Sequence, residues 1–119
     1  MSDLEALKKK VVAFCEARDW KQFHNPKDVS LSLMLEAAEV VEHFQWKSKE
    51  EMERHVKDHK DEIAEEVADT FYWILLLSHY LEIDLVEAFH RKMKQNEAKY
   101  PVDKAKGRHD KYTAYQNGK

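Results

Sequence analysis

Two sequences, EAAEVVE at residues 36–42 and EEVAD at residues 65–69, lie within one stretch that runs from Leu33 to Leu77. Each sequence is typical of an α-helix and carries carboxylates three residues apart, which places them on one face of that helix. The same helices are rich in Leu, Val, Phe and Ile. The pattern therefore predicts two helices whose carboxylates lie in largely apolar surroundings.

Four carboxylates converge if these two helices pack side by side, those of Glu36, Glu39, Glu66 and Asp69. Like charges at close range repel, and burying them is costly unless a cation lies between them. Oxygen ligands suit Mg²⁺, with Mn²⁺ as a substitute. The alternative, a solvated charged helix face, fits the apolar neighbours poorly. The residues alone thus indicate metal-assisted phosphate chemistry, in which the metal holds a polyphosphate and activates a water molecule.

The composition favours a single helical domain. The chain has 119 residues with only two glycines and two prolines, so few residues would interrupt long helices. A net charge of −3 gives no positive field for a nucleic-acid polymer, and the lone Cys15 excludes an internal disulfide and is expected to fill the core. No signal peptide is recognisable, and the apolar run 71–77 is too short to cross a membrane. We expect a soluble cytoplasmic protein.

The helical periodicity predicts four main helices: residues 3–18, from Asp28 or Ser30 to about residue 46, residues 61–81, and from Asp84 to Tyr100. Between them, residues 48–60 are expected to form a short solvated helix in which His55 and His59 are a chance surface pair. The fold class expected is an all-α four-helix bundle over residues 1–101, followed by a basic tail, residues 102–119, that either frays or packs on a neighbouring subunit. The apolar second half of the third helix favours oligomer burial over a monomeric bundle.

Two further segments could bind a ligand. The loop at residues 19–26 is rich in aromatic residues, and its Trp20 and His24 could hold a base and a phosphate, whereas Phe23 reads as a hydrophobic plug. On the last helix, Lys92 and Asn96 share a face but without other information read as a surface lysine and a helix-end amide. A di-iron site needs two Glu-x-x-His motifs, and only residues 87–90 fit.

The motifs resemble those of a known superfamily. LExxE at residues 35–39 with ExxD at residues 66–69 resembles the metal motif of the MazG-like all-α nucleoside triphosphate pyrophosphohydrolases. Further motifs look like the dCTP pyrophosphatase branch: RDWxQFHxP at 18–26, ExFQW at 42–46, KMxxNxxxYP at 92–101 and KYT at 111–113. The resemblance spans nearly the whole chain, and the combination of motifs is specific.

This resemblance implies an enzyme that cleaves a nucleoside triphosphate between its α and β phosphates. Glu36, Glu39, Glu66 and Asp69 would hold Mg²⁺, and Glu36 or Glu39 would be catalytic by accepting the proton of the attacking water. The expected substrate is a dNTP, dCTP or a modified dCTP in the first place, and the role is the cleaning of the nucleotide pool. The expected assembly is a homotetramer, as a dimer of dimers, or a homodimer.

The residues expected to contact substrate by this resemblance are Trp20, His24, Trp46, Trp73, Lys92, Asn96 and Tyr100. The two tryptophans Trp20 and Trp46 would line the base. Trp73 occupies a position where branch members often have tyrosine, which leaves the base and sugar preference open. The alternatives are an enzyme directed at dUTP or at nucleoside triphosphates in general, and a non-catalytic helical interaction module.

Overall fold

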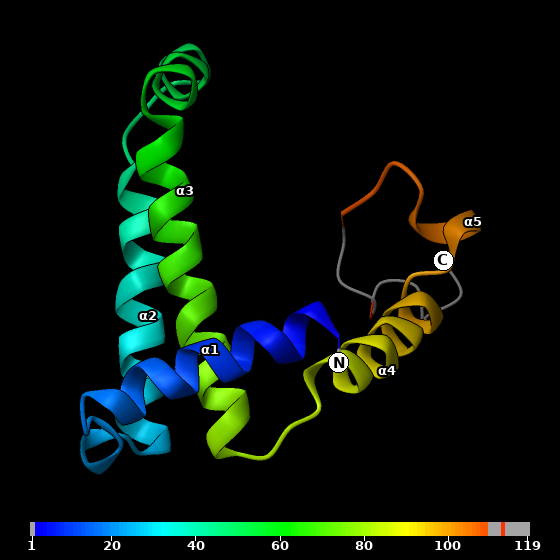
Figure 1. Cartoon of the computed structure of the whole chain (residues 1–119). Helices are drawn as coiled ribbons and strands as arrows, with labels where there is room; N and C mark the ends of the chain where they lie inside the picture. Colours follow the sequence, from blue (N-terminus) through cyan, green and yellow to red (C-terminus); the bar gives the residue numbers. More distant parts are fainter. Residues whose placement is uncertain (1, 110–112, 114–119) are drawn as a thin grey trace. The chain divides into compact units, whose positions relative to one another are not determined.

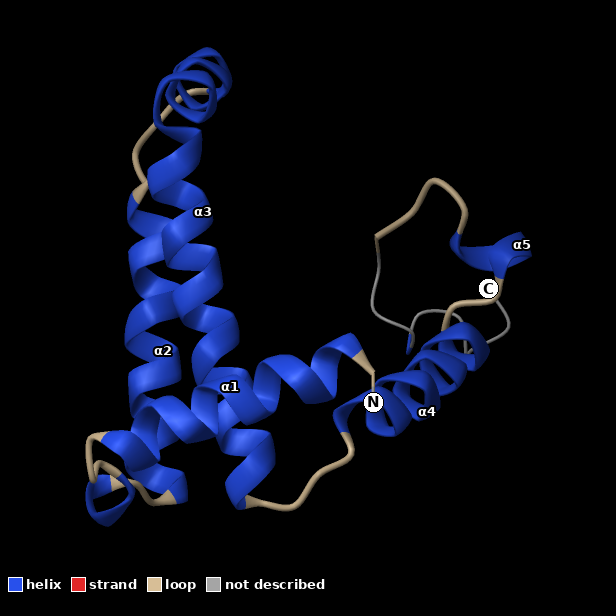
Figure 2. Cartoon of the chain, in the orientation of Figure 1, coloured by secondary structure: helices blue, strands red, loops and turns tan. Residues whose placement is uncertain are grey.

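The structure is a computed structural model that describes residues 2–109 and 113. All the regular secondary structure within these residues is helical (Figures 1 and 2). In chain order the elements are α1 (Asp3–Ala17), the 3₁₀ turn η1 (Lys21–Phe23), α2 (Pro26–Glu42), α3 (Lys49–Tyr80), α4 (Leu85–Lys99) and α5 (Val102–Ala105). The expected all-α class is confirmed. The chain divides into two compact units, residues 1–83 and residues 84–119.

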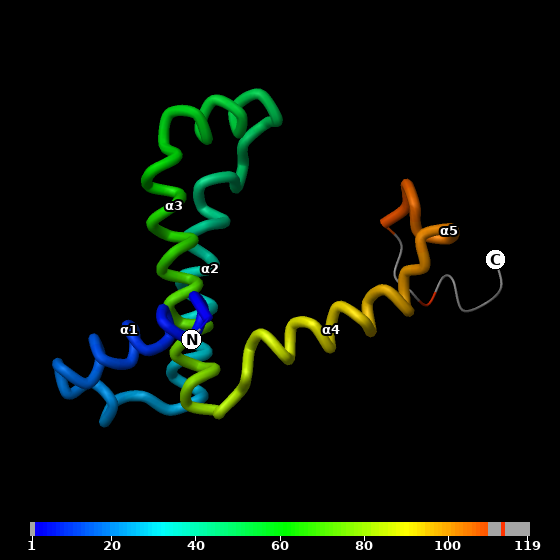
Figure 3. The backbone as a smooth tube through the Cα atoms, turned by 45° about the vertical axis from the view of Figure 1, so that its right-hand side comes forward, coloured from blue at the N-terminus to red at the C-terminus, as the bar shows by residue number. Residues whose placement is uncertain are grey.

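The first unit is built on α2 and α3. These helices lie side by side and run in opposite directions, and α1 packs across the C-terminal part of α3 (Figures 1 and 3). Packing α2 against α3 brings the two acidic motifs onto neighbouring helices, as the sequence predicts. The expected packing of all four helices into one bundle stays a prediction, because α4 belongs to the second unit.

The core of the first unit lies where the three helices meet. Cys15 of α1, Val29 of α2 and Leu76 of α3 are almost fully buried, and apolar residues of the same helices pack around them. Burying the side chains of Val29 and Leu76 contributes about 1.5 to 3 kcal/mol each. The thiol of Cys15 lies 3.1 Å from the hydroxyl of Tyr72, and burial together with this hydrogen bond raises the pKa of Tyr72. Cys15 is thus a core residue, as predicted.

Three of the expected helix starts are confirmed by their caps. The side chains of Ser2, Ser48 and Asp84 each accept a hydrogen bond from a backbone N–H in the first turn of the helix that follows. Ser48 forms a complete capping box, because the carboxylate of Glu51 also accepts from the backbone N–H of Ser48 at 3.0 Å. These contacts satisfy backbone donors that have no partner within the helix.

The bounds of α2 differ from the prediction at both ends. The helix begins at Pro26, before the predicted Asp28 or Ser30, because Asn25 is extended (φ −145°) and its side chain caps the N–H of Asp28. Proline suits the first helical position, where its missing N–H costs nothing. The helix ends at Glu42 rather than near residue 46, and turns follow that place Trp46 at φ 69°.

The charged connector is helical, as predicted, but it continues into the third helix. Helix α3 runs from Lys49 to Tyr80, with a kink at His59 (φ −126°, ψ 27°) that separates the connector from the segment predicted as residues 61–81. The prediction of two separate helices is therefore corrected to one kinked helix.

The second unit contains α4 and α5. Asp84 caps α4, whose residues Phe89 and Met93 are exposed within this unit. The division into a domain over residues 1–101 and a tail over 102–119 stays a prediction, and residues 111 and 112 of the KYT motif lie outside the described residues. Over residues 2–109 and 113, no helix is long and apolar enough to span a membrane.

Candidate active site

The four predicted carboxylates come from facing helices of the first unit. Glu36 and Glu39 lie on α2, and Glu66 and Asp69 lie on α3. Their proximity shows in the pKa of Glu36, which burial raises above its ordinary value. A hydrogen bond with Glu39 and the charges of Glu39, Asp69 and Glu66 raise it further. The structure thus brings together all four acids that the sequence singled out.

Two oxygens of this acidic cluster have no ordinary hydrogen bond. Oε2 of Glu36 is buried without a hydrogen-bond partner, and Oε2 of Glu66 is buried with the imidazole of His43 beside it but without a well-directed hydrogen bond, which is costly for a carboxylate oxygen. Within residues 2–109 and 113, no three acidic, histidine or cysteine donors are gathered closely enough to enclose a cation. Buried, unsatisfied carboxylate oxygens are hard ligands of the kind that Mg²⁺ prefers. The donor chemistry of these residues therefore fits a divalent cation, although their spacing in this structure does not enclose one.

A cavity of about 510 Å³ opens beside these acids. Its size lies within the range of small-molecule sites in proteins. Helix α1, the aromatic loop and the facing acids all contribute to its walls, which are Lys10, Val11, Phe14, Trp20, Glu36, Asp69, Tyr72 and Trp73. An apolar, aromatic wall next to carboxylates could hold a base on one side and a metal-bound phosphate chain on the other. Trp20 and Trp73 both line this cavity, and their contact with a base stays a prediction.

Contacts with α1 and α3 hold the aromatic loop in place. The ring of Trp20 meets that of Phe14 edge to face at 5.6 Å. Nδ1 of His24 lies 2.8 Å from the hydroxyl of Tyr80, and the ring of His24 lies edge to face against Trp73 at 6.0 Å. His24 therefore contacts Trp73, which lines the cavity, although His24 itself does not line it.

The remaining predicted substrate residues lie away from this cavity or in the other unit. Trp46 is 91% exposed in the turn after α2 and does not line the cavity. Lys92, Asn96 and Tyr100 belong to the second unit, where Lys92 and Asn96 lie one turn apart on α4 and the Asn96 amide is 3.9 Å from the sulfur of Met93. Their roles stay predictions.

A histidine cluster borders the acids, and sequence reasoning missed its connection to them. Nε2 of His43 lies 2.5 Å from Oε2 of Glu66, and Nδ1 of His43 lies 2.7 Å from Nε2 of His55. His59 stacks on His55 at 4.5 Å and pairs with Glu62 at 3.4 Å. The interpretation of His55 as half of a chance surface pair is therefore wrong.

A signal for this connection was present in the sequence. His43 follows Glu36 by seven residues and Glu39 by four, so a regular helix places it on the same face as both acids. Partial burial lowers the pKa of His55, and the neighbouring Lys47, His59 and His43 lower it further.

Comparisons with known proteins agree with this architecture. Residues 31–114 match the model of the MazG-like family. The chain is similar to dCTP pyrophosphatase 1 of Mus musculus, at 35% identity over 97% of this chain and 69% of the mouse protein, and to that of Homo sapiens, at 32% identity over the same shares. Its fold is similar to that of a pyrophosphatase from Archaeoglobus fulgidus, with a TM-score of 0.80 and 37% identity over 85% of this chain and 94% of the other.

The resemblance inferred from the motifs is thereby confirmed. The family match covers most of the chain, and the mouse relative aligns with nearly all of it at a level of identity that implies common descent. The protein belongs to the MazG-like family.

Proposed function

We propose that this protein is a Mg²⁺-dependent pyrophosphohydrolase that converts a dNTP to the monophosphate and pyrophosphate, with dCTP or a modified dCTP as the preferred substrate. Its broader class is plain from the family and from the named pyrophosphatase relatives: it is an enzyme, a nucleoside triphosphate diphosphatase. The observation that carries the proposal is the buried, unsatisfied carboxylate oxygen of Glu36, a residue that lines the aromatic cavity and lies near the carboxylates of Glu39, Glu66 and Asp69. The proposed role is nucleotide-pool cleaning in the cytoplasm.

The proposed division of labour follows from the two helices. Glu36 and Glu39 of α2 together with Glu66 and Asp69 of α3 would hold the cation. When bound, Mg²⁺ neutralises the triphosphate and polarises the phosphorus under attack. One of the two α2 carboxylates, Glu36 or Glu39, accepts the proton of the water molecule.

The base is proposed to lie between Trp20 and Trp73, since both rings line the cavity. His24 is close enough to Trp73 to reach the sugar or a phosphate. By the family resemblance, Lys92 and Asn96 on α4 are proposed to contact phosphate or sugar oxygens. Tyr100 is proposed to pack either on the sugar or at the end of the bundle.

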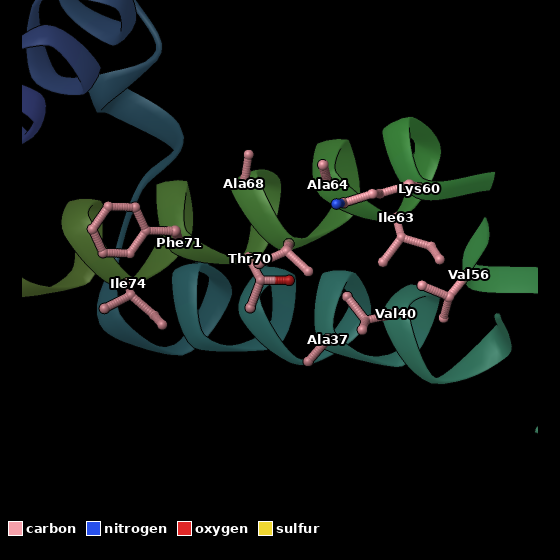
Figure 4. A pocket seen from close by; sticks show the side chains of 11 residues that line it. Ala37, Val40, Val56, Lys60, Ile63, Ala64, Ala68, Thr70, Phe71 and Ile74 are labelled. Atoms are coloured by element: carbon pink, nitrogen blue, oxygen red, sulfur yellow. The ribbon is translucent and has the colours of Figure 1, made fainter. Parts of the chain in front are cut away.

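We also propose that the protein assembles as a homodimer or as a dimer of dimers. An apolar groove of about 880 Å³ runs along α2 and α3, and its lining includes Val40, Ile63 and Phe71 (Figure 4). Val67 in the same groove is 51% exposed. A second copy would cover this surface with the same apolar side chains, as in a symmetric interface. A neighbouring copy could also use the exposed indole of Trp46 to line its own base site.

The test is to measure pyrophosphate release from each canonical dNTP with Mg²⁺ and with EDTA. We expect Mg²⁺-dependent release, highest with dCTP, and the monophosphate as co-product. The Glu39→Gln variant should lose at least about 10²-fold in kcat while its thermal unfolding stays close to that of the parent. Release of orthophosphate would place the cleaved bond elsewhere. Absence of turnover with every nucleotide, or a collapse of stability in Glu39→Gln, would favour a non-catalytic module with a structural metal site.

A further inference from the structure

The histidine next to the acidic cluster holds a defined position. His43 is the C-cap of α2, and its backbone N–H donates to the carbonyls of Val40 and Val41. Its side chain is only 12% exposed and crosses from α2 to α3, where Nε2 contacts Oε2 of Glu66 at 2.5 Å. Among the described residues this oxygen accepts no well-directed hydrogen bond, and the imidazole of His43 is the polar group that lies beside it.

The contact fixes which ring nitrogen of His43 carries hydrogen. A nitrogen lone pair facing a carboxylate at this distance would be repelled, so Nε2 must be protonated. In a neutral ring Nδ1 is then an acceptor, and His55, whose Nε2 lies 2.7 Å away, is its donor. If His43 is charged, both nitrogens donate, and Nε2 still presents its N–H to Glu66.

We propose that His43, supported by His55, is a positioning residue that orients the carboxylate of Glu66 toward the bound cation. This inference rests on the proposed function, in which Glu66 is a metal ligand. A carboxylate offers about four lone-pair positions, so a donor at Oε2 leaves others for a cation. Partners of this kind fix a ligand's rotamer, and their loss typically weakens metal binding by about 10- to 100-fold.

Two histidines of the cluster, His43 and His55, have the contacts that this role requires. His43 touches a proposed ligand, and His55 touches His43 from the connector segment of α3. His59 belongs to the same cluster, and its printed side-chain neighbours among residues 2–109 and 113 are the ring of His55 and the carboxylate of Glu62. His59 therefore provides a matched control, because it belongs to the same cluster but has no contact with His43 or with a proposed metal ligand among the described residues.

The competing explanation is that His43 only ties the end of α2 to α3. A purely structural contact would change the unfolding temperature without changing cation affinity. The experiment therefore measures the two properties separately, with Mn²⁺ as the probe in the absence of nucleotide, by electron paramagnetic resonance of the free ion, alongside the unfolding temperature of each variant.

His43→Leu removes the donor at similar volume and should raise the Mn²⁺ Kd about tenfold or more. The Mg²⁺ concentration for half-maximal activity should rise in parallel, with a smaller change in kcat at saturating Mg²⁺. His43→Gln, whose amide can donate from a similar place, should restore the Kd to within about threefold of the parent. His55→Leu should weaken binding less than His43→Leu, and His59→Leu should leave the Kd unchanged.

Two outcomes would overturn the inference, and they can be told apart. In the first outcome, the parent binds Mn²⁺ and releases pyrophosphate, and both His43→Leu and His43→Gln bind Mn²⁺ as tightly as the parent does. His43 is then structural, and the proposed function stands. If the parent itself does not bind Mn²⁺, the metal site fails and this inference fails with it. Should His43→Leu not fold, His55→Leu decides the question, since an unchanged Kd there contradicts the support assigned to His55.

Discussion

Glu36 is the residue at which the acidic cluster is most clearly unfavourable for the fold. Burial and three neighbouring carboxylates raise its pKa, and one of its oxygens is buried without a partner. A carboxylate in such a place destabilises the folded chain and is retained where function requires it. This conflict between stability and local charge is the strongest physical argument that the cluster is a site.

A pH dependence follows from His55. Its folded-state pKa is lowered, so between that value and about 6.5 the unfolded chain binds more protons at this position than the folded chain. His55 therefore costs stability at low pH, and its contribution improves as pH rises through this window. We expect His55→Gln to reduce the loss of thermal stability between about pH 7.5 and pH 5, measured by calorimetry without metal.

The matched control for this prediction is His90→Gln on α4, a histidine of the second unit that does not belong to the histidine cluster. The loss of thermal stability between about pH 7.5 and pH 5 should be closer to that of the parent in His90→Gln than in His55→Gln. If His55→Gln and the parent lose stability equally, His55 does not carry the effect.

At the scale of the element, α3 consists of two helical segments that differ in composition and in the functional residues they carry. The segment before the kink at His59 is charged and carries His55, and the segment after it carries Glu66, Asp69 and the core residue Leu76. The capping box at Ser48 starts the first segment, and its hydrogen bonds lower the pKa of Glu51. The order of this capped segment determines whether His55 can reach His43.

Removing the cap should therefore loosen the connector more than the core. We expect Ser48→Ala to cost about 1 kcal/mol and to lower the unfolding temperature by about 4 °C. Amide hydrogen exchange should increase over residues 49–58 and change little around Leu76. Ser48→Asp, which keeps an N-cap acceptor, is the control and should behave like the parent. Uniform loss of protection throughout α3 would contradict the idea of two segments.

At the scale of the whole molecule, the first unit leaves an apolar groove of about 880 Å³ open along α2 and α3. Its lining is almost entirely aliphatic and aromatic, and only Lys60 and Thr70 are polar. Exposed apolar surfaces of this kind commonly mark an interface between proteins. The groove shares α2 and α3 with the acidic cluster, so assembly and chemistry would depend on the same pair of helices.

A charge placed in this groove should prevent assembly. We expect the parent to have a mass of two or four times 14.2 kDa in light scattering after size exclusion, and Val67→Arg to have a smaller mass, that of one chain if the parent is a dimer and of one or two chains if it is a dimer of dimers. Val102→Arg, at a residue 76% exposed outside the groove, should assemble like the parent. A monomeric parent, or an oligomer that tolerates Val67→Arg, would contradict this interface.

Much of the fold could be predicted because its signals are local. Helical periodicity, three N-caps and the scarcity of glycine and proline gave the all-α class and most helix starts. The errors lie at element ends. Asn25-Pro26 was interpreted as loop although it starts α2, and the connector was separated from the helix that it continues. Such ends depend on which backbone group finds a partner, which periodicity does not report.

The sequence by itself determined the helices, the chemical nature of the four carboxylates and the family, because residue type and spacing along one helix are local properties. Only the tertiary structure decided what faces these acids across α2 and α3. It placed Trp20 and Trp73 in one cavity with Glu36, left Trp46 exposed, and joined His55 through His43 to Glu66. These contacts join residues far apart in the chain, and helix packing, which no single periodicity encodes, sets their geometry.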